Sequence, residues 1–358
     1  MILKNKRLTA LALSITSLFS MANDDSSVEF SGTIMLDYDN FDALFIETAD
    51  EAGSNTEIRH LRLGVDSDFA SNWRAKLSVD VKDGVDIKDA YLNYYGWQAF
   101  ELTIGKQKEP FGLENQMSSK NSWLIERAMI SNVIAPDRSI GIKASGEIDT
   151  VSWQLGYFQD DNSEKSTSIT GRLTWAPWLD DNNLVHVGTS FSERNLRGDD
   201  FRINQDLEVN TADSLIEGVK FNADSASLKG LELLWQYRGL SNMAEWQQTN
   251  VQANDGTEYV YQGGYYQMSY LLSGKNRKYK NGELGGLKTK NDWEVSLRYS
   301  QLYLQAENSE AQVFSVGLNY YFDKDLKIMA NYLNAEYVEQ GINLGSGNAL
   351  SIRAQYQF

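Results

Sequence analysis

Cationic and hydroxyl side chains gather in one segment of this acidic chain, between residues 105 and 138. Among them are Lys108, Ser118, Ser119, Lys120, Arg127 and Arg138. Ammonium, guanidinium and hydroxyl groups donate hydrogen bonds, and together they can replace the water around an oxyanion. The chemistry that this segment favours is therefore anion binding. The alternative interpretation is an external loop that carries ordinary surface lysines.

Few residues of the chain suit enzymatic chemistry. There are two histidines, His60 and His186, and both lie on the polar side of alternating segments. A Ser-His-Asp site would need one of them, yet no G-x-S-x-G motif lies near His186. The sequence also has no zinc-protease motif, no P-loop, no dinucleotide-binding glycine motif and no cysteine. We therefore predict no catalytic residue, no metal site and no cofactor.

The segments that would position these side chains alternate between apolar and polar residues. Between Phe314 and Phe322 nearly every second residue is a large apolar one, and the same period recurs in 73–82, 293–300 and 350–358. A period of two places alternate side chains on the two faces of a β-strand. The further candidate strands are 28–39, 58–66, 88–95, 100–105, 139–147, 151–159, 168–177, 183–192, 227–237, 242–248, 259–272 and 327–334. Sixteen candidates give about 21 residues for each strand and its connection, which is typical of porins.

Composition and connections favour a membrane barrel over a soluble fold. Aromatic residues make up 12%, with 19 Tyr and 9 Trp, which suits the aromatic belts of a membrane protein. Short turns alternate with long polar connections, among which we place 43–56, 107–138, 193–226 and 274–292. We predict an all-β fold, a transmembrane antiparallel β-barrel of about 16 strands. The connection after the fifth candidate strand is about 30 residues long, and an inward fold of this third loop would narrow the lumen.

The two ends of the sequence fit export to the outer membrane. Residues 1–22 have a charged start, the apolar run 8–19 and small residues before position 23, so we predict a signal peptide over 1–22 and a barrel over 23–358. The apolar run is too short to span a bilayer, which takes about 20 residues. The last predicted strand ends in the aromatic Phe358, as outer-membrane barrels typically do.

Net charge excludes one class of partner. The formal charge is -16, and without the predicted signal peptide it becomes about -19. A chain this acidic would repel nucleic acid. Net charge does not decide what lines a pore, because the local field depends on where each charge lies.

An ordered set of motifs resembles the phosphate-selective porin O and P family. The most specific is 110–114 (PFGLE), followed by Ser118-Ser119-Lys120 and Glu126-Arg127. The other matching segments are 59–65, 89–94, 269–274, 293–300 and 317–321. The resemblance covers nearly the whole chain after the predicted signal peptide. It implies a sixteen-stranded trimeric barrel with an inward-folded third loop.

Three positions depart from the family pattern. Asn115 follows the PFGLE motif where phosphate-specialised members carry lysine, His60 stands where a second arginine is usual, and Lys275 stands where a glutamate is frequent. These departures put strong phosphate selectivity in doubt and leave a general porin open.

The sequence therefore predicts a passive porin in the outer membrane of a Gram-negative cell. The substrates would be small anions, including phosphate or polyphosphate, and the partners would be outer-membrane lipid and two further copies of the chain. We expect the pore constriction to contain Lys108, Ser118, Ser119, Lys120 and Arg127 from the third loop and Arg62 and Lys82 from the wall. A non-selective porin, an outer-membrane barrel enzyme and a secreted all-β binding protein are the alternatives.

Overall fold

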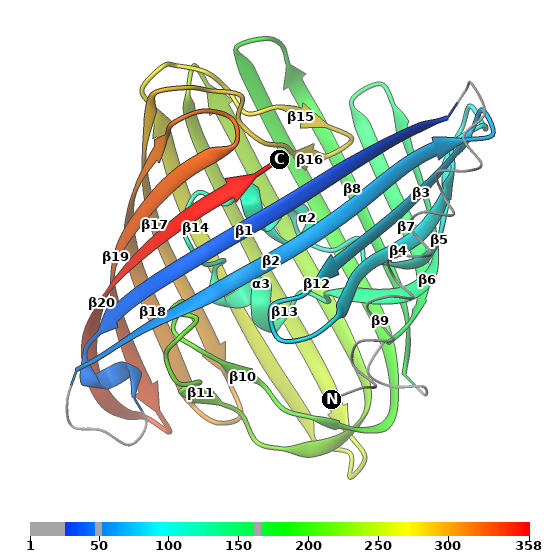
Figure 1. The fold of residues 1–358 in the computed structure, drawn as a ribbon. Coiled ribbons are helices and arrows are strands. Elements are labelled where there is room, and N and C mark those ends of the chain that lie inside the picture. The colour runs from blue at the N-terminus through cyan, green and yellow to red at the C-terminus, as the bar shows by residue number, and fades with distance from the viewer. Residues whose placement is uncertain (1–25, 47–51, 161–165) are drawn as a thin grey trace, which may run out of the picture.

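The chain folds into a closed barrel of antiparallel strands. The computed structural model describes residues 26–46, 52–160 and 166–358, so the predicted signal peptide lies outside the described residues. The strands pair with their neighbours in the order β1 to β9, β12 to β14 and β17 to β20, and β20 pairs with β1 to close the sheet (Figure 1). The predicted sixteen-stranded barrel is confirmed.

The barrel strands differ widely in length. Their bounds are β1 Ser27–Phe41, β2 Gly53–Phe69, β3 Trp73–Asp80, β4 Asp86–Tyr94, β5 Glu101–Lys108, β6 Arg138–Ile148, β7 Val151–Gln159, β8 Thr167–Leu179, β9 Asn183–Phe201, β12 Phe221–Tyr237, β13 Leu240–Ala253, β14 Glu258–Leu271, β17 Asp292–Leu304, β18 Ser309–Tyr321, β19 Leu326–Glu339 and β20 Ile342–Gln357. The connections hold the short strands β10 Asn204–Gln205, β11 Ile216–Glu217, β15 Tyr279–Lys280 and β16 Glu283–Leu284, and the short helices η2 Ala43–Phe45, α2 Leu113–Gln116, η3 Ser119–Asn121 and α3 Met129–Val133. Strands β9 and β12 reach well into 193–226, which the sequence assigned to a loop. Polar residues there stand on both faces and hide the alternation.

The barrel is apolar outside and polar inside. On β18 the outward residues Val316 and Leu318 are 36% and 44% exposed, whereas the inward Ser315 and Asn319 are 1% and 0% exposed. Apolar side chains on the exposed face and polar side chains on the buried one are the arrangement of a barrel in lipid, where closure also pairs the backbone groups. Within the described residues, no helix is long and apolar enough to cross a membrane.

The two mouths of the barrel carry different connections. The terminal mouth is the end where β1 begins and β20 ends, and the opposite mouth carries loop 3, residues 109–137. Most turns at the terminal mouth are short. One is not: residues 272–291, which contain β15 and β16 and are here named the hairpin segment, join β14 to β17 at this end. The sequence had grouped 274–292 with the long loops of the other side, and that placement is wrong.

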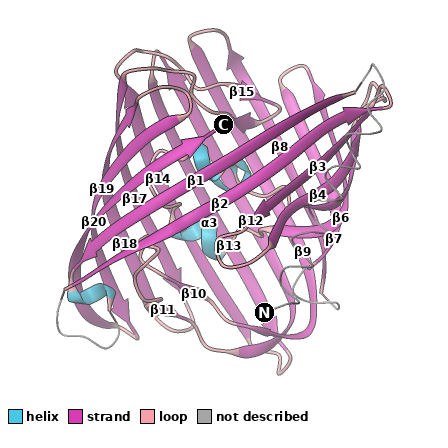
Figure 2. Ribbon diagram, in the orientation of Figure 1, coloured by secondary structure: helices cyan, strands magenta, loops and turns pink. Residues whose placement is uncertain are grey.

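Loop 3 folds into the lumen, as predicted. Figure 2 shows helices α2 and α3 inside the barrel. The loop buries its large apolar side chains: Phe111, Trp123 and Met129 are at most 1% exposed. They form one apolar cluster with side chains of the barrel and of residues 202–220, the connection between β9 and β12. Loop 3 and this connection thus fill one side of the lumen.

Candidate permeation site

A cavity of about 1270 Å³ lies on the other side of the lumen. Its wall comes from strands β1 to β7 and from one inner residue of β20, loop 3 covers it from the opposite mouth, and the hairpin segment reaches it from the terminal mouth. Its lining runs from Lys88 and Arg138, beside the opposite mouth, to Trp97 and Gln98 in a turn of the terminal mouth. The cavity therefore extends along most of the barrel.

The lining of the cavity is cationic although the chain is acidic. Thirteen Lys and Arg but six Asp and Glu line it, whereas the whole chain has 33 basic and 49 acidic residues. Charges of the two signs are thus segregated in space. Because water screens less in a narrow channel than in bulk, such a lining attracts anions and repels small cations.

Several of these cations have no carboxylate partner. Arg59, Arg62 and Arg138 each pair with an acid, at 3.0, 3.4 and 2.9 Å. By contrast, six cations of the lining have no carboxylate within 4.0 Å in the part of the chain that the structure describes. They are Lys108, Lys120, Arg127, Lys143, Lys278 and Lys280. An unpaired cation in a partly dehydrated lining is stabilised when an anion arrives.

Lys120 shows how the lining disfavours an unpaired positive charge. It lies in η3 of loop 3, at the cavity surface. Burial, followed by the nearby Lys76 ammonium, lowers the pKa of the Lys120 amine below its usual value. The lining by itself therefore disfavours the charged form of Lys120, and a bound anion would offset both effects.

Loop 3 is held by buried carboxylates of the opposite wall. Glu245 on β13 accepts the backbone N–H groups of Leu113 and Glu114, at 2.9 and 2.7 Å. Within the loop, Glu114 accepts the Ala128 N–H at 3.0 Å and the Ser131 hydroxyl at 2.6 Å. Inner-wall acids are thus used as acceptors behind the loop, and the loop's cations are left facing the cavity.

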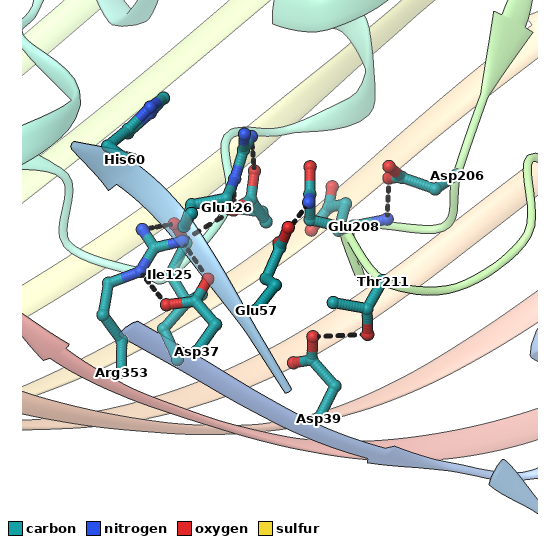
Figure 3. Close-up of polar contacts among 12 residues, drawn as sticks. Asp37, Asp39, Glu57, His60, Ile125, Glu126, Asp206, Glu208, Thr211 and Arg353 are labelled. Atoms are coloured by element: carbon teal, nitrogen blue, oxygen red, sulfur yellow. Dashed lines mark hydrogen bonds and ion pairs between the residues drawn. The ribbon is translucent and has the colours of Figure 1, made fainter. Parts of the chain in front are cut away.

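Guanidinium groups of the wall hold the middle of loop 3, at Ile125 and Glu126. Arg353 donates to the Ile125 carbonyl at 2.6 Å and pairs with Asp37 and Glu126 at 2.5 and 2.9 Å, as Figure 3 shows. Arg59 pairs with the same Glu126 at 3.0 Å. Burial favours the neutral form of Glu126, but the two guanidinium groups outweigh it and hold the pKa of this carboxyl at about 2.

The structure brings six of the seven predicted constriction residues to the cavity. They are Lys108, Ser118, Ser119, Lys120, Arg127 and Arg62. Two of the cations are also structural: the Lys108 ammonium donates to the Asn115 carbonyl at 2.6 Å, and Arg127 donates to the Met117 carbonyl at 2.9 Å. Lys82 lies elsewhere, after the end of β3, where its ammonium pairs with Glu57 at 2.7 Å.

Sequence reasoning missed the hairpin segment as part of the lining. Lys278, Lys280 and Glu283 reach the cavity, and so does Lys143 of β6, which the alternation placed on the inner face but which was left out of the constriction. Counting strands would have located the segment. It follows the twelfth barrel strand, and every connection after an even-numbered strand lies at the mouth of the termini.

Comparison with known proteins agrees with this arrangement. The sequence profile of the family described as "Phosphate-selective porin O and P" matches residues 28–358. The chain belongs to this family. It is therefore an outer-membrane porin of a Gram-negative cell, with the barrel and the inward loop 3 that the resemblance implied.

Individual relatives of this porin are distant in sequence. It is 23% identical to Porin O of Pseudomonas aeruginosa, over 93% of this chain and 88% of that protein. Among solved structures it resembles the anion-selective porin from Comamonas acidovorans, with TM-score 0.61 and 12% identity over 93% of this chain and 100% of that one. It also resembles in-vitro folded OmpT of Vibrio cholerae in its trimer form, with TM-score 0.61 and 14% identity over 93% and 99% of the two chains.

Proposed function

We propose that this porin is a passive channel for small anions, with inorganic phosphate among them. The observation that carries the proposal is the group of cavity cations that have no carboxylate partner. They come from β5, loop 3, β6 and the hairpin segment, so a permeating anion meets positive charge from several elements. The family is described as phosphate-selective and the Comamonas porin as anion-selective, and both descriptions support the same proposal.

Weak phosphate preference fits the lining better than strong phosphate binding. Asn115 stands where specialised members carry lysine, and its amide Nδ2 donates to the Pro136 carbonyl at 2.7 Å rather than into open space. Many of the remaining cations are already paired with acids, such as Arg138 with Asp89 at 2.9 Å. Passage requires that each site release its ion, and a partly neutralised lining meets this need.

The geometry favours passive passage over catalysis. A candidate catalytic histidine, His186, is fully buried and bonded on both ring nitrogens, to Tyr279 at 2.8 Å and Glu232 at 3.0 Å. The other, His60, accepts or donates a hydrogen bond with Asp80 at 2.7 Å, and among the described residues no serine or threonine bonds to its ring. We therefore propose a channel without enzymatic activity.

We further propose that the channel is a homotrimer. Strands β3 and β5 have 8 residues and β4 has 9, so the barrel wall is lowest at these three strands (Figure 1). A tilted strand needs about 9–11 residues to cross the hydrocarbon layer. A neighbouring copy packed against β3, β4 and β5 would shield this part of the wall from lipid. Unheated gel electrophoresis and mass photometry in detergent should give a particle with three times the mass of one chain. A particle with the mass of one chain would contradict the proposal.

Ion selectivity in planar bilayers tests the channel function. In a potassium chloride gradient the wild-type reversal potential should report anion preference. The double variant Lys120→Glu with Lys280→Glu reverses two charges of the cavity and should shift the reversal potential toward cations. A wild-type channel that prefers cations would contradict the proposed function.

A matched control separates local charge from net charge. Lys290 and Lys324 are exposed near the terminal mouth and do not line the cavity. The double variant Lys290→Glu with Lys324→Glu changes the net charge by the same amount and should keep the wild-type reversal potential. If the two double variants shift the potential equally, the cavity residues do not set the selectivity.

A further inference from the structure

The hairpin segment carries a single carboxylate into a cationic region. Residues 272–291 contain six Lys and Arg residues and one acidic residue, Glu283. Lys278, Lys280 and Glu283 line the cavity that loop 3 covers from the opposite mouth. In Figure 1, β15 and β16 lie at the end of the barrel where the chain terminates. The segment therefore brings charge of both signs to the pathway from the side away from loop 3.

The position of Glu283 is fixed by the contacts of its neighbours. The preceding Gly282 accepts a hydrogen bond from the Arg172 guanidinium at 2.8 Å, and a Cβ at Gly282 would lie 2.5 Å from the Thr174 hydroxyl oxygen. The following Leu284 is 2% exposed. The contacts of Gly282 and the burial of Leu284 hold the backbone of Glu283 in place, and its side chain lines the cavity from this position.

Two further contacts anchor the hairpin segment to the wall. Arg277 pairs with Glu294 of β17 at 2.5 Å. The Tyr279 hydroxyl bonds to the ring of His186 on β9 at 2.8 Å. All of these partners are buried on the inner wall, so the segment is a built part of the lumen rather than a surface turn.

Glu283 faces cations with which it forms no ion pair. Glu283 lines the same cavity as Lys143 of β6, and Lys280 lies opposite it in the β15–β16 pair. Yet no Lys, Arg or His nitrogen lies within 4.0 Å of its carboxylate in the described ranges of the chain. The carboxylate and these lysines therefore line one cavity without forming an ion pair.

We propose that Glu283 is a tethered counter-ion of the anion pathway: it competes with the permeating anion for the unpaired lysines and so speeds the release of the anion. The inference rests on the proposed function. Unopposed lysines would hold a multivalent anion tightly, and a conducting site must also let its ion go. Repulsion grows with the charge of the anion, so the carboxylate weakens binding of hydrogen phosphate more than of chloride.

Phosphate block of the chloride current tests this role. Single channels are recorded in potassium chloride while inorganic phosphate is added, for wild type and for Glu283→Gln, which keeps the shape and removes the charge. The variant should need at least about fivefold less phosphate for half-block, as expected when one charge near a divalent anion is removed. Its current in phosphate alone should fall, because release slows. Glu283→Asp should stay close to wild type.

The control removes a charge at the same mouth. Asp181 lies in the exposed turn between β8 and β9 and does not line the cavity, so Asp181→Asn should leave the half-block concentration unchanged. An equal half-block concentration in wild type and Glu283→Gln would overturn the proposal, even if wild type prefers anions. A wild-type channel without anion preference would overturn the proposed function and this inference together. Unheated electrophoresis confirms that each variant has formed its barrel.

Discussion

Glu126 shows how one residue can join loop 3 to the wall. Its carboxylate accepts hydrogen bonds from two nitrogens of the Arg59 guanidinium, both at 3.0 Å, and from the Arg353 guanidinium at 2.9 Å. Replacement by Gln removes the charge and leaves the buried Arg353 and the partly exposed Arg59 without the carboxylate that they share. Removing one member of a buried ion pair costs about 3–5 kcal/mol, and the partial exposure of Arg59 places the expected loss for Glu126→Gln at about 3 kcal/mol.

The pH dependence of this loss follows from the pKa of Glu126, which is about 2 in the folded chain. An ordinary glutamate has a pKa of about 4.3. The stabilisation by the ionised carboxylate is therefore fully present above about pH 4.3 and is lost as the pH falls through about 2. Urea unfolding of wild type and Glu126→Gln should differ at pH 7 and converge near pH 2. A difference that is constant with pH would contradict the assignment, and the exposed Glu258→Gln should show little effect at either pH.

Asp206 has a raised pKa, in contrast to Glu126. It lies in the connection between β9 and β12, where it accepts hydrogen bonds from the Gln205 amide at 2.8 Å and the Glu208 N–H at 3.0 Å. Burial, followed by repulsion from Glu126, raises the pKa of Asp206 to about 7. Since an unfolded aspartate has a pKa of about 3.9, ionisation destabilises this connection increasingly as the pH rises from about 4 to 7.

Replacement of Asp206 by Asn should remove this pH dependence. Hydrogen exchange of residues 202–220, corrected for the intrinsic rate, should show stronger protection for Asp206→Asn than for wild type at pH 8. The two proteins should be alike near pH 4. Equal protection at pH 8 would show that ionisation of Asp206 does not destabilise the connection. The exposed Asp224→Asn, on β12 just beyond this connection, is the control.

At the scale of elements, loop 3 depends on acceptors that lie far away in the sequence. Glu245 accepts two backbone N–H groups of loop 3 and the Tyr265 hydroxyl, the last at 2.5 Å. A hydrogen bond to a charged group contributes about 1.5–3 kcal/mol. The change Glu245→Ala should therefore free the start of α2, raise single-channel conductance and increase current noise. Glu336→Ala, which removes an exposed strand carboxylate, should conduct as wild type does. Unchanged conductance in Glu245→Ala would show that loop 3 is held without this anchor.

The sequence predicted elements well where one face of a strand meets lipid. Alternation located all sixteen barrel strands, because apolar and polar neighbours differ sharply in that setting. It failed beyond the apolar band, where β9 continues to Phe201 through residues that are polar on both faces. It also gave no sign of which wall residues would hold loop 3. Glu245 and Arg353 were visible as inner-face charges, but their partners lie more than 100 residues away and depend on how the loop packs.

The site was predictable to the extent that local composition signals it. Lys108, Lys120 and Arg127 stand out because they are close in sequence and break the alternation. The hairpin segment reads as an ordinary polar loop, since nothing local distinguishes a loop that turns inward from one that projects outward. Only the whole barrel, through the parity of its strands, assigns that segment to the terminal mouth.

At the scale of the whole molecule, the outer face must match lipid while the lumen stays hydrated. Val316 lies in the middle of β18 on the outer face, where it is 36% exposed between Leu297 of β17 and Tyr332 of β19. A positive charge there has no water and no acceptor. An arginine on the lipid face near the bilayer midplane costs about 2–4 kcal/mol, so Val316→Arg should lower the free energy of unfolding by that amount.

The lumen offers the matched substitution. Ser145 of β6 lines the cavity and is partly exposed, so an arginine placed there can keep its charge in water. Ser145→Arg should cost much less than Val316→Arg in reversible urea unfolding from lipid vesicles. It should also add to the anion preference, because it extends the cationic lining. Equal losses for the two variants would mean that both faces meet the same solvent, which a barrel with an apolar exterior and a charged interior does not allow.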